Sequence, residues 1–308
     1  MEIRKYTSPF ECDDIISLWE EIFGEAEAEL ERVQLDGSET EHNTDIVYAA
    51  YEDDILLGTV HITIAKKHPD LCGVSGVCTT NAARGKGISK VLFKYAMDEA
   101  DSMGVKAAFL GTGNPYAIKV YTSNGFIFIP CTGAMARVKD SDFHTYTKNL
   151  YSAKSEKISI CRGSPDVRLP IIPLAYCTGG DGFLDVNAGI VGRGITFSQV
   201  SCMGLFQKYL DLEKSGGKYC SAANELGTVG AMASAMKTDR GLRADFFCVK
   251  AFESAVPQMI DRLGADYLQI SDADEYKQQL AEQMGYKKTA PIMEPYRACI
   301  IPMHIYER

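Results

Sequence analysis

The sequence predicts a mixed α/β protein built from two tandem domains. Apolar residues in the N-terminal half follow a strand period in some segments and a helix period in others. Two groups of short motifs recur in the C-terminal half in the same order. The length of 308 residues is also about twice that of a ~150-residue domain, so each half is long enough to bury its own core.

The N-terminal half reads as strands followed by crossover helices. Residues 55–65 form a strand expected to be half-buried, because Val60, Ile62 and Ile64 alternate with polar residues. A helix is expected after an N-cap at Asp13 or Asp14, where apolar residues recur at helical spacing up to Phe23. The other expected elements are strands at 2–6, 46–51, 72–79, 106–111 and from 125, and helices at 88–103 and 115–124. This order is typical of a mixed sheet covered by helices.

An internal repeat supports the two-domain prediction. The tetrapeptide Leu-Gly-Thr-Val at 57–60 recurs at 226–229. The Gly104 to Gly125 interval is matched by Gly264 to Gly285, and both glycine pairs are 21 residues apart. We therefore predict a first domain over 1–140, a linker over 141–158 and a second domain over 159–308.

Charge and composition exclude several classes of protein. The net charge is −9, and thirteen acidic residues lie between Glu11 and Asp45 against one base, Arg32. Without a basic stripe, no nucleic-acid partner is expected. No apolar stretch approaches the ~18 residues of a membrane span, so no membrane partner is expected. Ten cysteines without a CxxC pair indicate reduced thiols in a cytoplasmic protein, and no metal site is expected.

A glycine-rich turn between the strand at 72–79 and the following helix is the strongest candidate site. Its sequence is Arg84-Gly85-Lys86-Gly87-Ile88-Ser89. Glycines permit positive φ and a close approach of a ligand, and backbone N–H groups converge where a helix begins. An anion, best a pyrophosphate, suits this turn. It matches neither the Walker loop nor the dinucleotide-binding fingerprint.

These residues resemble the acetyl-CoA pyrophosphate loop, (Gln/Arg)-x-x-Gly-x-(Gly/Ala), of the GCN5-related N-acetyltransferases (GNAT). Ser89 departs from the last position but is small enough to keep the turn. After the next strand, the run Asn114-Pro115-Tyr116-Ala117-Ile118-Lys119-Val120-Tyr121 and then Gly125-Phe126 resemble a second motif of the family. The resemblance covers about residues 1–140.

The resemblance implies roles for individual residues. The backbone of Val77 and Thr79 would pair with the pantetheine arm, and Asn114 would hydrogen-bond the pantetheine or the substrate. Tyr121 would donate a proton to the departing CoA thiolate, although a helix tyrosine can also simply pack in the core. The pyrophosphate would be held by Arg84, Gly85, Lys86, Gly87, Ile88 and Ser89.

The general base is not identified by the sequence. Many family members carry a glutamate on the strand before the loop, but residues 73–76 here are Gly-Val-Ser-Gly. The base is then expected from elsewhere or through a water chain. His61 is one candidate, although a strand histidine is more often merely exposed, and Asp70 is more simply a turn residue. Cys72 and Cys78 are expected to be buried thiols.

The second copy resembles a degenerate acetyltransferase-like domain. Nine residues are missing between its hairpin and the end of its first crossover helix, and the cofactor loop is interpreted as deleted. Ala281 stands at the position of Tyr121. This domain is expected to shape the substrate cleft or an interface.

The leading functional hypothesis is an N-acetyltransferase that moves an acetyl group from acetyl-CoA to a primary amine. The acidic segment 11–45 would form a rim that attracts a small cationic amine, although a solvated helix face would also explain it. The alternatives are a non-catalytic acyl-CoA sensor and a tandem-domain aminoacyl transferase using tRNA. A homodimer is possible.

Overall fold

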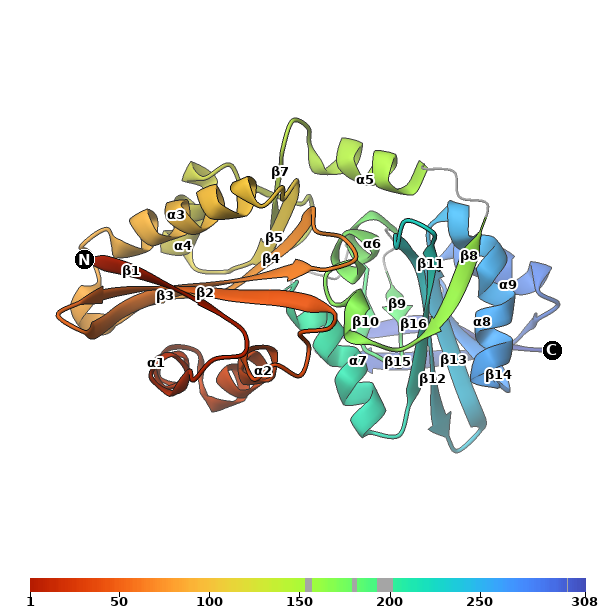
Figure 1. Ribbon diagram of the computed structural model, residues 1–308. Helices are drawn as coiled ribbons and strands as arrows, with labels where there is room; N and C mark the ends of the chain where they lie inside the picture. The colour runs from red at the N-terminus through yellow and green to blue at the C-terminus, as the bar shows by residue number, and fades with distance from the viewer. Residues whose placement is uncertain (153–156, 179–181, 193–201, 298) are drawn as a thin grey trace. The chain divides into compact units, whose positions relative to one another are not determined.

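The computed structural model describes residues 1–152, 157–178, 182–192, 202–297 and 299–308. The chain divides into two compact units, shown in Figure 1. The first consists mainly of Met1–Phe128 and Ala134–Asp142, and the second mainly of residues from Phe143 onward. Among the described residues, no helix is long and apolar enough to cross a membrane.

A seven-stranded mixed sheet forms the centre of the first unit. Neighbouring strands are antiparallel, except that β4 and β5 are parallel. In spatial order the strands are β1 (Glu2–Thr7), β2 (Asn43–Glu52), β3 (Ile55–Ala65), β4 (Leu71–Thr79), β5 (Ala107–Gly111), β7 (Ala134–Val138) and β6 (Ile127–Phe128).

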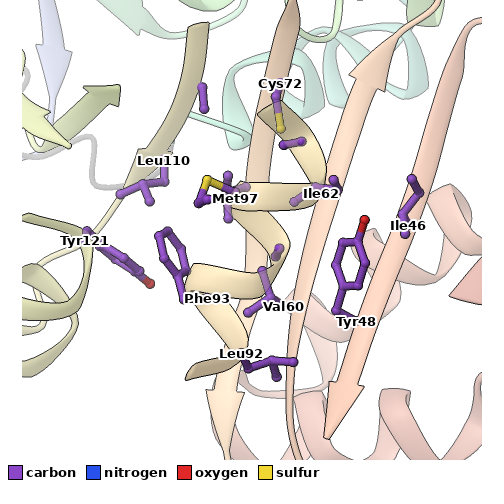
Figure 2. Packing of buried hydrophobic residues seen from close by; sticks show 14 of the residues in the cluster. Ile46, Tyr48, Val60, Ile62, Cys72, Leu92, Phe93, Met97, Leu110 and Tyr121 are labelled. Atoms are coloured by element: carbon purple, nitrogen blue, oxygen red, sulfur yellow. The ribbon is translucent and has the colours of Figure 1, made fainter. Parts of the chain in front are cut away.

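Helices cover both faces of this sheet (Figure 1). Helices α1 (Asp13–Phe23) and α2 (Glu25–Leu35) lie against one face, and α3 (Ile88–Ser102) and α4 (Pro115–Ser123) cover the other. Figure 2 shows Val60 and Ile62 of β3 packed among Leu92, Phe93 and Met97 of α3. Burying such apolar side chains on each face is the main force that holds the layers together.

The sequence reading of this unit needs two corrections. The strand β3 was expected to be half-buried, but Thr59, His61 and Thr63 are fully buried as well, because α1 and α2 cover their face. Asp13 and Asp14 are not N-caps but occupy the first turn of α1, after an N-cap at Cys12. Carboxylates are also favourable there, since they face the positive end of the helix.

The second unit repeats the topology of the first. Its seven strands follow the same order, with one parallel pair, β13 and β14, at the equivalent place. In spatial order they are β8 (Ile158–Arg162), β11 (Lys218–Asn224), β12 (Val229–Thr238), β13 (Gly241–Cys248), β14 (Tyr267–Ser271), β16 (Cys299–Glu307) and β15 (Lys287–Tyr296). The predicted mixed α/β fold class with two sheets is confirmed.

Helices α8 (Val256–Leu263) and α9 (Glu275–Gln283) follow β13 and β14 as α3 and α4 follow β4 and β5. The chain between β8 and β11 instead carries α6 (Ile171–Thr178), the hairpin of β9 (Phe183–Asp185) and β10 (Ile190–Val191), and α7 (Gly204–Lys214). The predicted linker 141–158 contains a helix, α5 (Phe143–Ser152), and part of it lies outside the described residues.

Candidate active site

Strand β4 has an open edge in the first unit. It pairs with β5 only at its beginning, and the last pair is Gly73 with Phe109. Beyond that point the two strands diverge, so among the described residues no strand pairs with the β5-facing edge of residues 74–79. Unpaired backbone N–H and C=O groups at a strand edge are a template for an extended ligand. Val77 and Thr79, both half-buried, lie on this stretch.

A bulge at Gly76 sets the direction of the open edge. The register between β3 and β4 shifts here, and Gly76 has φ +55°. A Cβ at Gly76 would lie 2.5 Å from the Trp19 ring. The Trp19 indole N–H donates to Thr59 Oγ1 (2.8 Å), which in turn donates to the Gly76 carbonyl (2.6 Å). A glycine is therefore required both by the backbone conformation and by the indole packed against it.

The glycine-rich turn follows the open edge directly. A short 3₁₀ turn, η1 (Asn81–Ala83), leads to Arg84, and both Gly85 and Gly87 have φ +77°. A Cβ at either glycine would meet nothing within 4 Å, so the positive φ, not crowding, is what calls for glycine here.

Helix α3 begins after this turn without a side-chain cap and without an acidic residue in its first turn. Its first N–H groups therefore remain available to a ligand. Arg84, Lys86 and Lys90 are exposed around them, whereas Ile88 is buried and anchors the helix start in the core. This turn fits a pyrophosphate group, because it offers backbone donors, open space over two glycines and three cations.

Tyr121, the predicted proton donor, is buried on α4. Its ring lies beside that of Phe93 (Figure 2), and its centroid is 4.8 Å from that of Phe93 and 6.2 Å from that of Phe126. Burial, helped by the nearby Cys78 thiol, raises the pKa of Tyr121 well above its usual value. Burial also raises the pKa of the Cys78 thiol, to about 11.

Asn114 is the N-cap of α4. Its side-chain oxygen accepts hydrogen bonds from the N–H groups of Tyr116 (2.9 Å) and Ala117 (3.4 Å). The amide nitrogen, on an exposed side chain, is then the group that can donate to a ligand.

A buried polar cluster lies on the other face of the sheet, beside the bulge. His61 Nδ1 is 2.6 Å from Glu31 Oε2, and His61 Nε2 is 3.0 Å from Asp45 Oδ1. Ser75 Oγ donates to Glu31 Oε2 at 2.9 Å and lies 3.0 Å from His61 Nδ1. Burial alone would lower the pKa of His61, but the hydrogen bonds to Asp45 and Glu31 raise it to about 9.

Sequence reasoning placed His61 among the candidate bases, but the expectation that it is exposed is wrong. It did not find Glu31 or Asp45. A signal was nevertheless present, since Glu31 lies at helical spacing from Ala28 and Leu35, which are both fully buried. Asp45 shares the strand parity of Val47 and Ala49, whose side chains are buried under α1 and α2.

The other candidates have structural explanations. The Asp70 carbonyl accepts from the N–H groups of Lys106 and Ala107, and the hydrogen bond from His68 lowers the pKa of its carboxyl. Asp70 precedes β4 and so lies at the opposite end of the strand from the turn. Cys72 and Cys78 are buried, as expected. Within the described ranges, no group of three or more His, Cys, Asp or Glu side chains could hold a metal ion.

The equivalent region of the second unit lacks the glycine-rich turn. Strand β13 passes directly into η4 (Lys250–Ala255). Strands β13 and β14 also diverge after two paired positions. A cavity of about 500 Å³ lies beyond that point, lined by residues 246–250 after the divergence and 273–277 at the start of α9. Ala281, at the position of Tyr121, is fully buried in the core.

In the first unit, a diverging pair of parallel strands leads into an uncapped helix start, an arrangement that suits an extended ligand bearing phosphate groups. Residues 12–126 match the model of the acetyltransferase (GNAT) family. No curated protein matches the sequence.

Three solved structures illustrate the likeness. Escherichia coli YhbS, a GNAT N-acetyltransferase in complex with CoA, is 19% identical over 44% of this chain and 80% of its own, with a TM-score of 0.35. The Bacillus subtilis acetyltransferase in complex with CoA is 18% identical over 41% and 77%, with a TM-score of 0.32. Tetrahymena GCN5 is 13% identical over 37% and 67%, with a TM-score of 0.31. At such TM-scores these likenesses do not assign an activity.

Proposed function

We propose that this protein is an N-acetyltransferase that moves the acetyl group of acetyl-CoA to the primary amine of a small cationic molecule. The observation that carries the proposal is the uncapped, glycine-rich start of α3 at the end of the unpaired β4 edge, within a segment that matches the GNAT model. Acetyl-CoA, when bound, supplies an acetyl group activated as a thioester.

The geometry of the open edge and the turn supports the binding residues that the resemblance implies. The backbone of Val77 and Thr79 would pair with the amides of the pantetheine arm. The N–H groups from Gly85 to Ser89 and the positive end of α3 would hold the pyrophosphate, with Arg84 and Lys86 adding charge. Asn114 would donate from its amide nitrogen.

Tyr121 would act as the general acid. Because burial holds its pKa high, the phenol keeps its proton across the physiological range. The phenol would therefore be present in its protonated form to pass a proton to the departing thiolate.

The acidic segment supports a cationic acceptor. Ten of its thirteen acids are exposed on or beside α1 and α2, on the face of the sheet that also buries His61. A surface of one sign raises the local concentration of the opposite charge, so this segment would attract an ammonium group. The positive charges of Arg84, Lys86 and Lys90 lie at the glycine-rich turn, where they would bind the phosphates of acetyl-CoA and would not repel the amine.

Calorimetry with acetyl-CoA on the wild type and on Gly87→Glu tests the proposal. We expect Gly87→Glu to weaken binding at least about tenfold, because a carboxylate would enter the anion site. Gly104→Glu is the matched control, since Gly104 is also exposed, has φ +90° and lies at the other end of α3. Equal binding by all three proteins would refute the proposed site.

A second measurement separates an enzyme from a protein that only binds the thioester. Release of free CoA thiol is followed with a panel of small mono- and polyamines. Amine-dependent release by the wild type is expected. Tight binding of acetyl-CoA without release for any amine would refute the transferase activity while leaving the binding site in place.

A further inference from the structure

We infer that Glu31 and His61 together accept the proton that the acceptor ammonium must lose, and that Asp45 positions and tunes His61. The inference rests on the proposed function, because it assigns a role within the same reaction. It supplies the base that the sequence of residues 73–76 lacks.

The geometry of the cluster is that of a relay. The carboxylates of Glu31 and Asp45 face the two ring nitrogens of His61, and Thr63 Oγ1 donates to Asp45 Oδ1 at 2.7 Å. The side chains of His61 and Asp45 have no exposed surface, whereas that of Glu31 is 19% exposed. Glu31 is therefore the member that solvent or a substrate can reach.

The cluster lies where the open edge begins. Ser75 is paired with His61 across β3 and β4, and its half-buried hydroxyl contacts both Glu31 and His61. The next residue is Gly76, whose bulge coincides with the divergence of β4 from β5. A substrate amine that approaches an acyl group held along this edge would meet Ser75 and Glu31 first.

The charges around the imidazole favour one bound proton. Among the described residues, Glu31 of α2 and Asp45 of β2 are the ionisable groups that hydrogen-bond it. The neighbouring side chains of α1 and β4 are uncharged: Trp19 is stacked on the ring at 5.9 Å, and Ser75 Oγ lies 3.0 Å from Nδ1. The resulting pKa of about 9 lies close to that of an alkylammonium group, roughly 10, so a proton can pass between them at little cost.

In the proposed step, the deprotonated cluster takes one proton from R–NH₃⁺ and leaves R–NH₂ with a free electron pair. The amine nitrogen forms the new C–N bond with the acetyl carbon, and the C–S bond breaks with its electron pair on sulfur. Tyr121 gives its proton to that sulfur and regains one, through water, from the amide nitrogen. The proton that the cluster took from the ammonium group leaves through Glu31 to solvent, so the reaction releases one proton overall.

Asp45→Asn is the decisive variant, because Asp45 is buried and touches no substrate. Removing its charge is expected to lower the pKa of His61 by about 1–3 units. The kcat/KM of the wild type should rise with pH and level off near 9, and this limb should move to lower pH by the same amount in the variant. The titration of the His61 ring, followed by NMR in the free protein, should move in parallel.

Two controls keep the readings separate. Asp70→Asn removes a carboxylate beside another histidine, His68, and should leave the profile unchanged. Two acceptors whose ammonium pKa values differ by about 2 units show whether the pH dependence of kcat/KM comes from the substrate.

Glu31→Gln should lower kcat at least about 100-fold with unchanged binding of acetyl-CoA.

The outcomes distinguish this inference from the proposed function. The proton relay is overturned, even if acetyl transfer is fast, by either of two results. One is a pH dependence of kcat/KM that is the same in Asp45→Asn as in the wild type, and the other is a His61 ring that titrates near 6.5 in the wild type. Absence of amine-dependent CoA release from the wild type overturns the proposed function instead, whatever the NMR titration of His61 gives.

Discussion

Burial disfavours the ionised form of both Tyr121 and His61. The ionised form is the phenolate for Tyr121 and the imidazolium for His61, so burial raises the pKa of the first and opposes protonation of the second. Tyr121 therefore keeps its proton because it is buried, whereas His61 keeps its proton in spite of burial, through Glu31 and Asp45. The first unit thus holds a protonated phenol on one face of its sheet and, on the other face, a histidine whose pKa lies near that of an amine.

Replacing Tyr121 with phenylalanine isolates its hydroxyl. The ring contacts with Phe93 and Phe126 remain, so the fold and the affinity for acetyl-CoA should be unchanged. Loss of a general acid is expected to lower kcat roughly 100-fold or more. Steady-state kinetics beside calorimetry checks this. If turnover is unaffected, Tyr121 is only a packing residue of α4.

The pKa of His61 also makes stability depend on pH. It is about 9 in the folded protein against roughly 6.5 in an unfolded chain, so the folded state binds this proton more tightly. The stabilisation is complete below pH 6.5 and disappears as pH rises through 9, a change of about 3 kcal/mol. Denaturant unfolding between pH 6 and 9.5 should show this loss in the wild type and a smaller one in His61→Gln. Parallel curves for the two proteins would contradict the raised pKa.

At the scale of single elements, the bulge in β4 depends on one glycine. In Gly76→Ala, the new methyl group would lie 2.5 Å from the Trp19 ring, at a φ of +55°. We expect a loss of about 2 kcal/mol or more, from the strained backbone and the overpacked indole. Weaker binding of acetyl-CoA should accompany it, because the bulge directs the open edge. The control Gly85→Ala keeps the unfavourable φ but meets no neighbour, so it should cost only about 1–2 kcal/mol.

Sequence reasoning reached the elements that carry local signals. The turn at 84–89, the helix from Pro115 and the paired glycines of the repeat are read from short segments, and each lies where it was predicted. Helix α2 and the burial of both faces of β3 were missed. They depend on each other: α2 is rich in glutamate, and only its packing over β3 shows that Glu31 points inward and that His61 is covered.

The divergence of β4 from β5 was not predictable either. The sequence shows two strands of suitable length, but it does not show that their pairing stops at Gly73. The roles of Val77 and Thr79 remain predictions drawn from the resemblance to the GNAT family. The structure adds a physical reason for them, namely a stretch of strand edge that the sheet leaves unpaired.

At the scale of the whole molecule, one topology occurs twice with different chemistry. Both units have a diverging parallel strand pair, but the first adds the glycine-rich turn and the second lacks it. The second unit instead buries an ion pair beside its cavity, Lys277 Nζ to Asp245 Oδ1 at 2.7 Å. Lys277 also donates to the carbonyls of Phe183 and Leu184. Burial opposes its charge, yet Asp245 raises the pKa of Lys277 above its usual value.

Lys277→Met tests whether phosphate-ligand binding belongs to the first unit alone. Removing the lysine strands the buried Asp245 carboxylate and should cost the second unit about 3–5 kcal/mol. Acetyl-CoA at 100 times its Kd should still stabilise the first unit by about 2.7 kcal/mol, as in the wild type. Calorimetric unfolding with and without ligand measures both quantities. Lys208→Met, which removes a lysine that donates to the Gly189 carbonyl, should cost about 1 kcal/mol. If Lys277→Met abolished the response to acetyl-CoA, the second unit would have to take part in binding it.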